Sequence, residues 1–451
     1  MATFDKKAPG VYVEEISKLP PSVASVATAI PGFVGYTEKG TKNTAIRVES
    51  LIDFEEKFGY ACKIAISEED KINGLEYKLH ESMRLFYANG GGTCYVVSVG
   101  NYKDAISNTA LETGISMLEP IDEVTMIVVP DAVSLEIKDL ASVQNAALAQ
   151  CLELKDRVAI LDVKDTGNCN TDATNFRNSI GTKGASYGAA YYPYIKSVYD
   201  REINVYDIYK GLELSNQELE NAQYYAELSE PTEESTLFAK QLMSKPEYAK
   251  LVAKIQEQAN LLPPSGAIAG IYCANDNQRG VWHAPANMSV SGISDINVRI
   301  SDKQQGELNE NTSGKCINAI RAFQGKGILV WGARTLDGLS SEWKYISVRR
   351  FFNYVEESIQ ESTAWAVFQP NDANTWVKVR CQIENFLSNL WRDGALAGST
   401  PQEAFYVRVG INQTMTAQDI LNGYMIVEIG MAAVRPAEFI VLQFSHKLQE
   451  S

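Results

Sequence analysis

The sequence predicts a multidomain protein of the α+β and α/β classes, with a core of mixed sheet and helices and an extended strand arm at each end. Between residues 124 and 163 a strand, a helix and a second strand follow one another, which is typical of a parallel α/β unit. Two later segments, 348–359 and 376–390, repeat apolar residues at helical spacing. Short strands are predicted at 11–16 and 438–444, close to the two ends of the chain.

The first strand is separated from the next apolar run, at 29–36, by Pro20 and Pro21, which stiffen the segment between them. A strand isolated in this way has few local partners. It either forms an edge of its own domain or adds to the sheet of a neighbouring chain. The residues of this strand are Val11, Tyr12, Val13, Glu14, Glu15 and Ile16.

The α/β unit has its apolar strands at 124–129 and 158–163. A dinucleotide-binding fold would place a G-x-G-x-x-G turn after the first strand, whereas Pro130, Asp131 and Ala132 follow it here. We therefore interpret this unit as a structural layer.

Residues 200–260 are rich in Glu, together with Gln, Ala, Tyr and Lys, until the Pro-Pro-Ser-Gly sequence at 263–266 ends the region. This composition predicts solvated helices on the surface of the protein.

Two strands are predicted at the end of the chain, at 424–429 and 438–444. The last strand ends within a few residues of Ser451 and, like the first, is able to leave its own domain. Its residues are Glu438, Phe439, Ile440, Val441, Leu442, Gln443 and Phe444.

Composition argues against several classes of function. The 451 residues carry a net charge of −15 at pH 7, which does not suit a protein whose main activity is to bind nucleic acid. Seven scattered Cys with no C-x-x-C pair are typical of reduced thiols in a cytoplasm. With only three His and no H-E-x-x-H motif, we predict neither a metal site nor another cofactor. No Sec signal peptide and no membrane-spanning segment are expected.

One motif suggests an enzyme. Residues 184–188 match the G-x-S-x-G nucleophile elbow, which makes a serine hydrolase using Ser186 the alternative function. The elbow requires an apolar strand before it and a helix after it, but 180–183 are not such a strand and Pro193 follows closely. We therefore expect a structural protein rather than an enzyme, with no catalytic residue.

A series of sequence segments matches a known family in order. Between residues 314 and 444, where the match is densest, they are Ile317–Phe323, Gly325–Leu336, Tyr345–Arg350, Glu356–Ile359, Trp365–Asn371, Glu384–Leu387, Leu390–Trp391, Gly394–Leu396, Val427–Gly430 and Arg435–Ile440. The upstream segments are Ala8–Glu15, Phe33–Tyr36, Asp156–Asp162, Ala189–Pro193, Pro263–Gly266 and Arg279–Asn287. Through these segments the sequence resembles the contractile tail sheath family over nearly its whole length.

The resemblance implies a structural subunit that polymerises helically around an inner tube and contracts from a metastable extended state to drive the tube through a target membrane. Its partners would be other copies of itself or sheath paralogues, the inner-tube protein, and baseplate and cap proteins. Neither contact with nucleic acid nor insertion into a membrane is expected. In this family the first and last strands exchange between neighbouring subunits, so 11–16 and 438–444 are the predicted inter-subunit strands. Pro20, Pro21, Arg435 and Pro436 are then the predicted hinges.

The predicted domains follow from the same resemblance. Residues 1–40 form the amino-terminal arm, and 41–100 with 265–451 form the sheath core, which ends in the donated strand. Residues 101–264 form one or more inserted outer α/β domains, which include the acidic segment 200–260. The helix predicted at 376–393 is a candidate for contact with the tube, although its apolar stripe also suits a core.

The charges are unevenly distributed along the chain. Residues 315–451 carry 13 basic and 13 acidic residues, whereas residues 61–314 carry 21 basic and 35 acidic ones. A neutral carboxyl-terminal part suits closely packed copies of one chain, and the acidic middle is expected to face outward. We expect assembly in a bacterial cytoplasm and release as a phage-tail-like extracellular injection particle; a myophage or type VI secretion sheath is the alternative within the family.

Overall fold

The computed structural model describes residues 23–67, 71–228, 230, 232–310 and 312–439. The chain divides into two compact units. The sheet unit consists of Val26–Glu357 and Val434–Ser451, and the hairpin unit of Met1–Ser25 and Ser358–Ala433, in each case as far as these residues are described.

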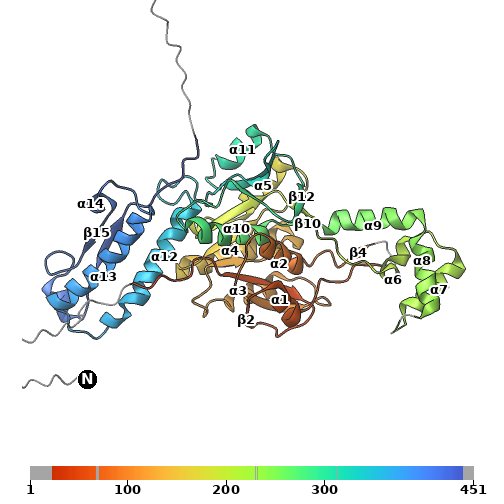
Figure 1. The fold of residues 1–451 in the computed structure, drawn as a ribbon, viewed down its shortest axis with the longest axis horizontal. Helices are drawn as coiled ribbons and strands as arrows, with labels where there is room; N and C mark the ends of the chain where they lie inside the picture. The colour runs from red at the N-terminus through yellow and green to blue at the C-terminus, as the bar shows by residue number, and fades with distance from the viewer. Residues whose placement is uncertain (1–22, 68–70, 229, 231, 311, 440–451) are drawn as a thin grey trace, which may run out of the picture. The chain divides into compact units, whose positions relative to one another are not determined.

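A mixed sheet of nine strands forms the centre of the sheet unit (Figure 1). From one edge to the other the strands are β11 (Met288–Ser289), β14 (Gly327–Val330), β13 (Ile317–Phe323), β8 (Gly188–Tyr192), β7 (Val158–Asp162), β6 (Met126–Val128), β1 (Pro31–Thr37), β5 (Cys94–Asn101) and β2 (Ala45–Val48). The strands from β13 through β8, β7, β6 and β1 to β5 run parallel to their neighbours, while β2, β14 and β11 are antiparallel. The parallel pair predicted between residues 124 and 163 is confirmed as β6 and β7.

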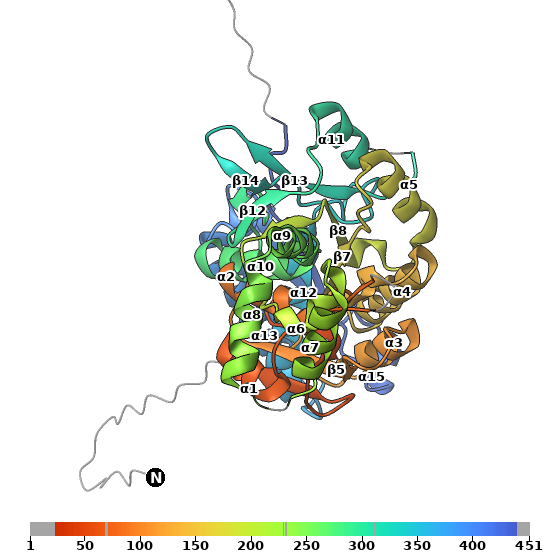
Figure 2. The same ribbon diagram turned by 90° about the vertical axis from the view of Figure 1, so that its right-hand side faces the viewer.

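Helices cover both faces of this sheet (Figure 2). One face carries α2 (Leu79–Ala88) and α10 (Ser265–Arg279). The other carries α3 (Asn108–Ser116), α4 (Ile137–Leu154) and α5 (Cys169–Ser179). An apolar cluster lies on each face of the sheet. The strands from β13 to β5 each contribute side chains to both clusters, because successive side chains of a strand point to opposite faces.

Helices α2 and α10 pack with their backbones close together. A Cβ atom on Gly266 would lie 2.5 Å from the carbonyl oxygen of Ser82, and one on Gly270 would lie 2.4 Å from that of Phe86. Any larger residue at these two positions of α10 would push the helices apart.

The first turns of these two helices are hydrogen-bonded to buried carboxylates, which lie at the carboxyl ends of two neighbouring strands. Asp162, the last residue of β7, accepts hydrogen bonds from the backbone nitrogen of Ser265 at 2.9 Å and from its hydroxyl at 2.5 Å, at the start of α10. Asp131, just after β6, accepts from the backbone nitrogens of Lys78 at 2.5 Å and Leu79 at 2.9 Å, at the start of α2. Each carboxylate satisfies donors that have no partner within the helix.

The sheet crosses the predicted domain boundaries. Strand β1 lies inside the predicted 1–40 arm, yet it is buried throughout and pairs with β5 and β6, so residues 31–37 are a central strand of the sheet. Strands β6, β7 and β8 come from the predicted insertion 101–264 and complete the same sheet. The differences arise because the pairing partners of parallel strands lie far along the chain, whereas the predicted ranges followed local pattern.

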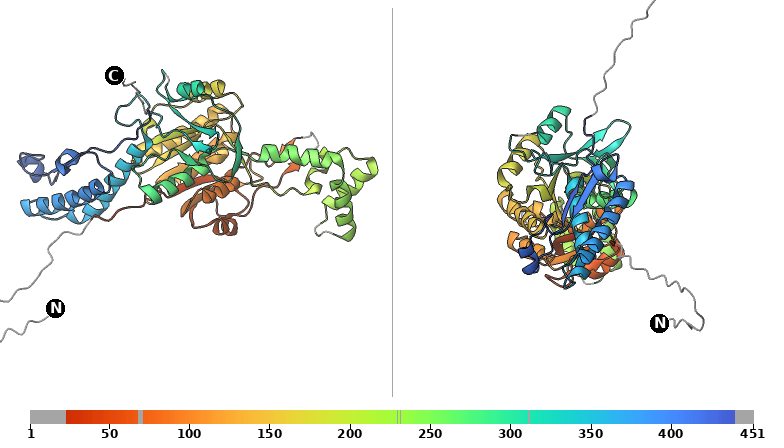
Figure 3. Two further views of the ribbon diagram at one scale, coloured as in Figure 1. Left: turned by 45° about the horizontal axis from the view of Figure 1, so that its top comes forward. Right: turned by 90° about the vertical axis from the view of Figure 1, so that its left-hand side faces the viewer.

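Most of the acidic segment 200–260 forms a small lobe that leads away from the sheet within the same unit (Figure 3). Its helices are α6 (Val205–Ile208), α7 (Asn216–Ala226), α8 (Glu233–Met243) and α9 (Pro246–Ala259), which confirms the predicted helical character. We call residues 200–260 the acidic lobe. It has a core of its own, made by Val205, Tyr209, Leu212, Ala222, Phe238 and Leu242.

The acidic lobe is connected to the rest of the sheet unit through a three-stranded sheet. Its strands are β10 (Leu261–Leu262), β9 (Ile195–Ser197) and β12 (Ile293–Ile296). The hairpin of β3 (Ala65–Ile66) and β4 (Ile72–Asn73) packs on the lobe, where Ile64 and Ile66 contact Ile208 and Ile255. Helices α1 (Leu51–Phe58) and α11 (Asp302–Asn309), and α12 (Ile346–Thr363) as far as Glu357, also belong to the sheet unit.

The hairpin unit contains the end of α12 (Ile346–Thr363) and all of α13 (Ala373–Arg392), which confirms the two helices predicted from apolar spacing. Gln382 of α13 accepts a hydrogen bond from the indole of Trp365 at 2.8 Å and donates to the carbonyl of Ser362 at 2.9 Å. The unit ends with α14 (Pro401–Ala404), β15 (Phe405–Arg408), α15 (Ala417–Leu421) and β16 (Glu428–Met431). Strand β16 begins four residues later than predicted, because Tyr424 donates to the carbonyl of Asp419 and so closes the end of α15.

Candidate assembly sites

Most residues of the predicted inter-subunit strands and one pair of predicted hinge residues lie outside the described part of the chain. This applies to residues 11–16, to Pro20 and Pro21, and to residues 440–444. The structure describes Arg435, Pro436, Glu438 and Phe439, and none of these four belongs to a strand. The sites that can be built from the described residues are therefore the roots of the two arms and the sheet edges that could receive a strand.

The root of the carboxyl-terminal arm is attached to the sheet unit through the side chains of Arg435 and Glu438. Arg435 donates to the carbonyl of Ser341 at 2.6 Å. The carboxylate of Glu438 accepts hydrogen bonds from the guanidinium of Arg334, with Nε–Oε1 at 2.8 Å and Nη2–Oε2 at 2.7 Å. It also accepts one from the hydroxyl of Tyr345 at 3.1 Å. The side chain of Arg334 is 2% exposed and that of Glu438 is 21% exposed, so the guanidinium is buried and the carboxylate covers it from the partly exposed side.

Burial and this ion pair act in opposite directions on Arg334. Burial lowers the pKa of the guanidinium, but the hydrogen bonds and the charge of Glu438 outweigh it and raise the pKa above its ordinary value. Burial and the neighbouring carboxylate of Glu438 both raise the pKa of Tyr345, which keeps its hydroxyl protonated as a donor.

The root of the amino-terminal arm is attached to the sheet unit at Thr28 and Ile30. Arg350 of α12 donates to the carbonyl of Thr28 at 2.9 Å. The backbone of Ile30 exchanges hydrogen bonds with Thr125, whose hydroxyl accepts from the Ile30 nitrogen at 2.9 Å. Both contacts precede β1. Residues 23–25 belong to the hairpin unit, where the backbone nitrogen of Ala24 donates to the hydroxyl of Ser362 at 3.1 Å.

Strands β15 and β16 form a separate antiparallel sheet in the hairpin unit. Phe405 is paired with Met431, Tyr406 with Gly430, and Val407 with Ile429. Among the described residues, strands β15 and β16 pair only with each other. A two-stranded sheet of this kind presents backbone donors and acceptors along both outer edges and is ready to accept further strands.

The directions of these backbone groups follow from one hydrogen bond. The nitrogen of Ala432 donates to the carbonyl of Ala404 at 2.8 Å, so these opposed residues form a hydrogen-bonded pair. Because such pairs alternate along an antiparallel ladder, the backbone groups of Val407 and Ile429 point away from their partner strand. They are the groups that a third and a fourth strand would meet.

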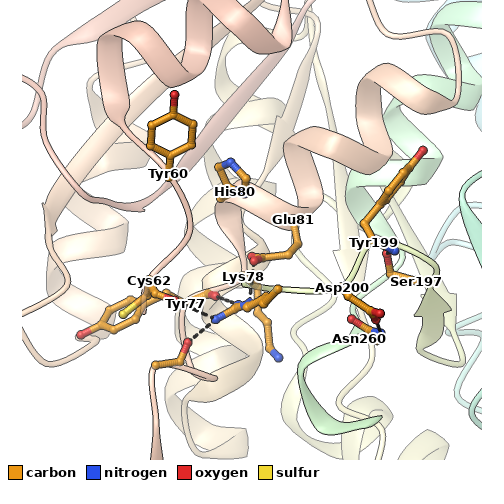
Figure 4. A network of polar contacts seen from close by, with 12 residues as sticks. Tyr60, Cys62, Tyr77, Lys78, His80, Glu81, Ser197, Tyr199, Asp200 and Asn260 are labelled. Carbon is orange, nitrogen blue, oxygen red and sulfur yellow. Dashed lines mark hydrogen bonds and ion pairs between the residues drawn. The ribbon is translucent and has the colours of Figure 1, made fainter. Parts of the chain in front are cut away.

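A buried polar network attaches the acidic lobe to the sheet unit (Figure 4). Arg201, at the start of the lobe, pairs with Glu81 of α2 at an Nε–Oε1 distance of 2.6 Å, and the two side chains are 2% and 3% exposed. Arg201 also donates to the carbonyls of Gly74 at 2.5 Å and Tyr77 at 2.7 Å. At the other end of the lobe, in an exposed position outside the buried part of the network, Asn260 donates to Asp200 at 2.6 Å.

Lys78 belongs to the same network. Its ammonium group donates to the carbonyl of Leu261 at 3.3 Å, and burial, assisted by the charge of Arg201, lowers its pKa to about 8. Because Lys78 and Arg201 both donate to backbone carbonyls, we interpret the network as structural: it holds the acidic lobe against α2.

The motif considered for a hydrolase does not have the elbow geometry. Ser186 lies in a one-turn 3-10 helix at Ala185–Tyr187, and this turn precedes strand β8. A nucleophile elbow has the opposite order, with the strand first and a helix after the serine. Among the described residues, no group of three or more His, Cys, Asp and Glu side chains is arranged to hold a metal ion. No helix in the described part of the chain is long and apolar enough to cross a membrane.

Two segments of the chain match known protein families. Residues 340–447 match the family described as the phage tail sheath C-terminal domain, and residues 104–336 match the phage tail sheath protein central domain. The second match alone covers more than half of the chain. The chain belongs to the phage tail sheath family. This confirms the resemblance stated from the sequence.

Solved sheath structures resemble this sheath protein over nearly its full length. A chain of the PVC sheath complex, an extracellular contractile injection system in its contracted state, is 32% identical with a TM-score of 0.69, and the match covers 99% of both chains. A chain in the baseplate structure of the anti-feeding prophage is 30% identical with a TM-score of 0.65, covering 98% of this chain and 99% of that one. These likenesses confirm the predicted mixed fold.

The curated relatives are more distant in sequence, at 23–25% identity. The tail sheath protein of Vibrio phage KVP40 is 23% identical over 192 residues, which is 42% of this chain and 27% of that protein. The chain spans less than half the length of the curated tail sheath proteins that it matches.

Sequence reasoning missed the residues that hold the roots of the arms. The contacts of Arg334, Arg350 and Asp276 were not predicted, because the groups that these residues contact lie far away in the chain. The one available signal was that all three are charged residues within otherwise apolar or strongly patterned segments, a setting in which burial requires a partner.

Proposed function

We propose that the chain is a structural subunit of a contractile sheath that polymerises helically around an inner tube and contracts to drive the tube through a target membrane. The observation that carries this proposal is the likeness to the PVC sheath chain over 99% of both chains. A subunit whose contacts with its neighbours do not close into a ring builds a filament, as a sheath requires. Other copies of this chain or paralogues, an inner-tube protein, and baseplate and cap proteins are its proposed partners.

Strand exchange is the proposed link between subunits. Residues 11–16 and 438–444 would leave their own subunit and add to the β15–β16 sheets of neighbours, one on each open edge. The outward-pointing backbone groups at Val407 and Ile429 support this arrangement. Backbone hydrogen bonds would then keep neighbouring subunits joined while the subunits rotate.

Contraction on this proposal needs no nucleotide hydrolysis within the subunit. The extended sheath is kinetically trapped, and repacking of subunit contacts releases free energy that adds along the filament. Even about 1 kcal/mol per subunit becomes large when it is summed over many copies.

The proposed setting is an extracellular contractile injection particle, assembled in a bacterial cytoplasm. The match at 32% identity comes from such a particle, whereas the two phage relatives are 23% and 25% identical. The acidic lobe is proposed to face outward, where its excess of carboxylates keeps particles apart.

The proposal is tested by purifying the full chain and imaging it by negative-stain electron microscopy. We expect sheath-like tubes or rings from the wild type, and we expect a variant lacking residues 1–18 to fold but not to polymerise. Unchanged polymerisation and contraction of that variant would contradict strand donation by residues 11–16. An esterase activity that is lost in Ser186→Ala would instead support the hydrolase alternative.

A further inference from the structure

Glu438 lies at the start of the predicted donated strand, yet it is bound to the interior of its own subunit. Three hydrogen-bond contacts join its carboxylate to Arg334, at 2.8, 3.1 and 2.7 Å. The remaining nitrogen of the guanidinium, Nη1, donates to the carbonyl of Asn309 at 2.8 Å. Every nitrogen of the Arg334 side chain therefore has a partner, and Glu438 is its only carboxylate partner among the described residues.

Arg334 is itself fixed to the middle of the nine-stranded sheet. Its backbone nitrogen donates to the side chain of Asn318 at 2.7 Å, and its carbonyl accepts from the same side chain at 2.8 Å. Asn318, on β13, also donates to the carbonyl of Ala190 on β8 at 3.1 Å. A continuous path of hydrogen bonds thus runs from Glu438 through Arg334 into two neighbouring strands.

Removing Glu438 from this position would leave a charged guanidinium inside the protein without its counter-ion. The side chain of Arg334 is 2% exposed, and a buried charge that loses its partner is strongly destabilising. The bidentate geometry also fixes the orientation of the carboxylate, since the planar guanidinium matches its two oxygens. By contrast, Phe439 is 70% exposed, so the side chain that follows Glu438 is not held in the interior.

We propose that Glu438 is the fixed root of the carboxyl-terminal arm: it stays bound to Arg334 of its own subunit in the assembled sheath, and the donated strand begins after it. The inference rests on the proposed strand exchange and alters two of its details. Glu438 is not part of the strand that a neighbour receives. The arm turns after Glu438 rather than at the predicted hinge, Arg435 and Pro436, and tension on the donated strand passes through Arg334 into β13 and β8.

The test compares full-length variants as unassembled subunits, separated by size-exclusion chromatography. Glu438→Gln and Arg334→Met each remove the ion pair, and the double variant removes both partners. Glu257→Gln is the matched control, since its pair with Lys196 at 3.8 Å is on the surface and the Glu257 side chain is 72% exposed. We expect each single variant to lower Tm by roughly 5 °C, the double variant to fall no further than the larger single effect, and the control to match the wild type.

A second measurement locates the root directly. Unassembled subunits are treated with a nonspecific protease, and the new carboxyl terminus is identified by mass spectrometry. We expect trimming of the wild type to stop at or after Glu438, and trimming of Arg334→Met and Glu438→Gln to proceed upstream of it. The same end point in all three proteins would overturn the proposal.

The outcomes separate this inference from the proposed function. If the single variants keep the Tm of the wild type as unassembled subunits and lose only sheath formation, Glu438 acts in a neighbouring subunit and the root proposal is wrong. If the wild type forms no sheath while the variants lower Tm and shift the end point of trimming, the root stands and the proposed function fails.

Discussion

Arg350 and Asp276 form a bidentate ion pair in the interior of the sheet unit, with side chains 3% and 2% exposed. Their oxygen–nitrogen distances are 3.0 and 2.6 Å, and the guanidinium also donates to the carbonyl of Thr28. The guanidinium carbon lies 4.6 Å from the ring centre of Tyr272. Burial lowers the pKa of Arg350, but the charge of Asp276 raises it by more, so the pKa of the guanidinium lies above its ordinary value. The pair joins α12 and α10 to the segment from which the amino-terminal arm departs.

The first prediction concerns this pair. Asp276→Asn leaves Arg350 buried without a counter-ion, so we expect the free energy of unfolding to fall by about 3 kcal/mol, measured by urea denaturation of unassembled subunits.

The control for this prediction is Asp295→Asn. Asp295 pairs with Arg299 at 2.7 Å on the surface, with side chains 40% and 67% exposed, and such a pair adds little to stability. Equal losses of unfolding free energy in the two variants would show that the buried Arg350–Asp276 pair stabilises the fold no more than the surface pair does.

The second prediction concerns pH. Burial raises the pKa of Asp162 to about 7, while the hydrogen bonds from Ser265 act in the opposite direction. In the unfolded chain the same carboxyl has a pKa of about 4. Between these values the folded protein binds more protons than the unfolded one, so the stabilising contribution is complete below about pH 4 and is lost as the pH rises through about 7.

Asp162→Asn should remove this contribution from the pH profile. We expect the free energy of unfolding of the wild type to fall between pH 5 and pH 8 by roughly 2 kcal/mol more than that of the variant. Urea titrations at the two pH values give the comparison. Asp295→Asn, on the surface, should follow the wild type; a profile of Asp162→Asn parallel to both would refute the assignment.

The sequence allowed those parts of the structure to be predicted in which the signal is local. The pair β6 and β7 with its helix α4, and the helices α12 and α13, follow from apolar runs and spacing within short windows. The place of β1 did not follow, because its partners β5 and β6 begin 63 and 95 residues after the start of β1. A strand buried on both faces has no alternation to identify its neighbours.

The same reason limits the prediction of the assembly sites. The terminal strands were predicted by pattern and stay predictions, whereas the residues that hold the roots of the arms were not predicted. Glu438 is 104 residues from Arg334, and Arg350 is 322 residues from Thr28. No spacing rule connects such residues, and only the folded sheet brings them together.

The third prediction tests the outward orientation proposed for the acidic lobe. A short epitope tag placed in the connection between α7 and α8 should be bound by antibody equally well on assembled sheaths and on unassembled subunits, because nothing would cover an outward-facing lobe. Immunogold labelling of negatively stained particles measures this, with untagged sheaths as the control. A tag that is reached only on unassembled subunits would place the lobe inside the wall of the sheath.

The fourth prediction concerns the edge of β16. The backbone nitrogen of Ile429 points away from β15, so a proline there removes a donor from the open edge without breaking the ladder between the two strands. We expect Ile429→Pro subunits to remain folded but to lose sheath formation, measured by sedimentation and electron microscopy.

Ile429→Val is the matched control for that edge, because it keeps the backbone donor and nearly the same side chain. It should assemble like the wild type. Because a donated strand is held chiefly by main-chain hydrogen bonds, loss of one donor together with the steric bulk of the proline ring should prevent docking rather than merely weaken it. Sheaths of normal length from Ile429→Pro would mean that the donated strand docks elsewhere, and the outer edge of β15, at Val407, would be the next site to block.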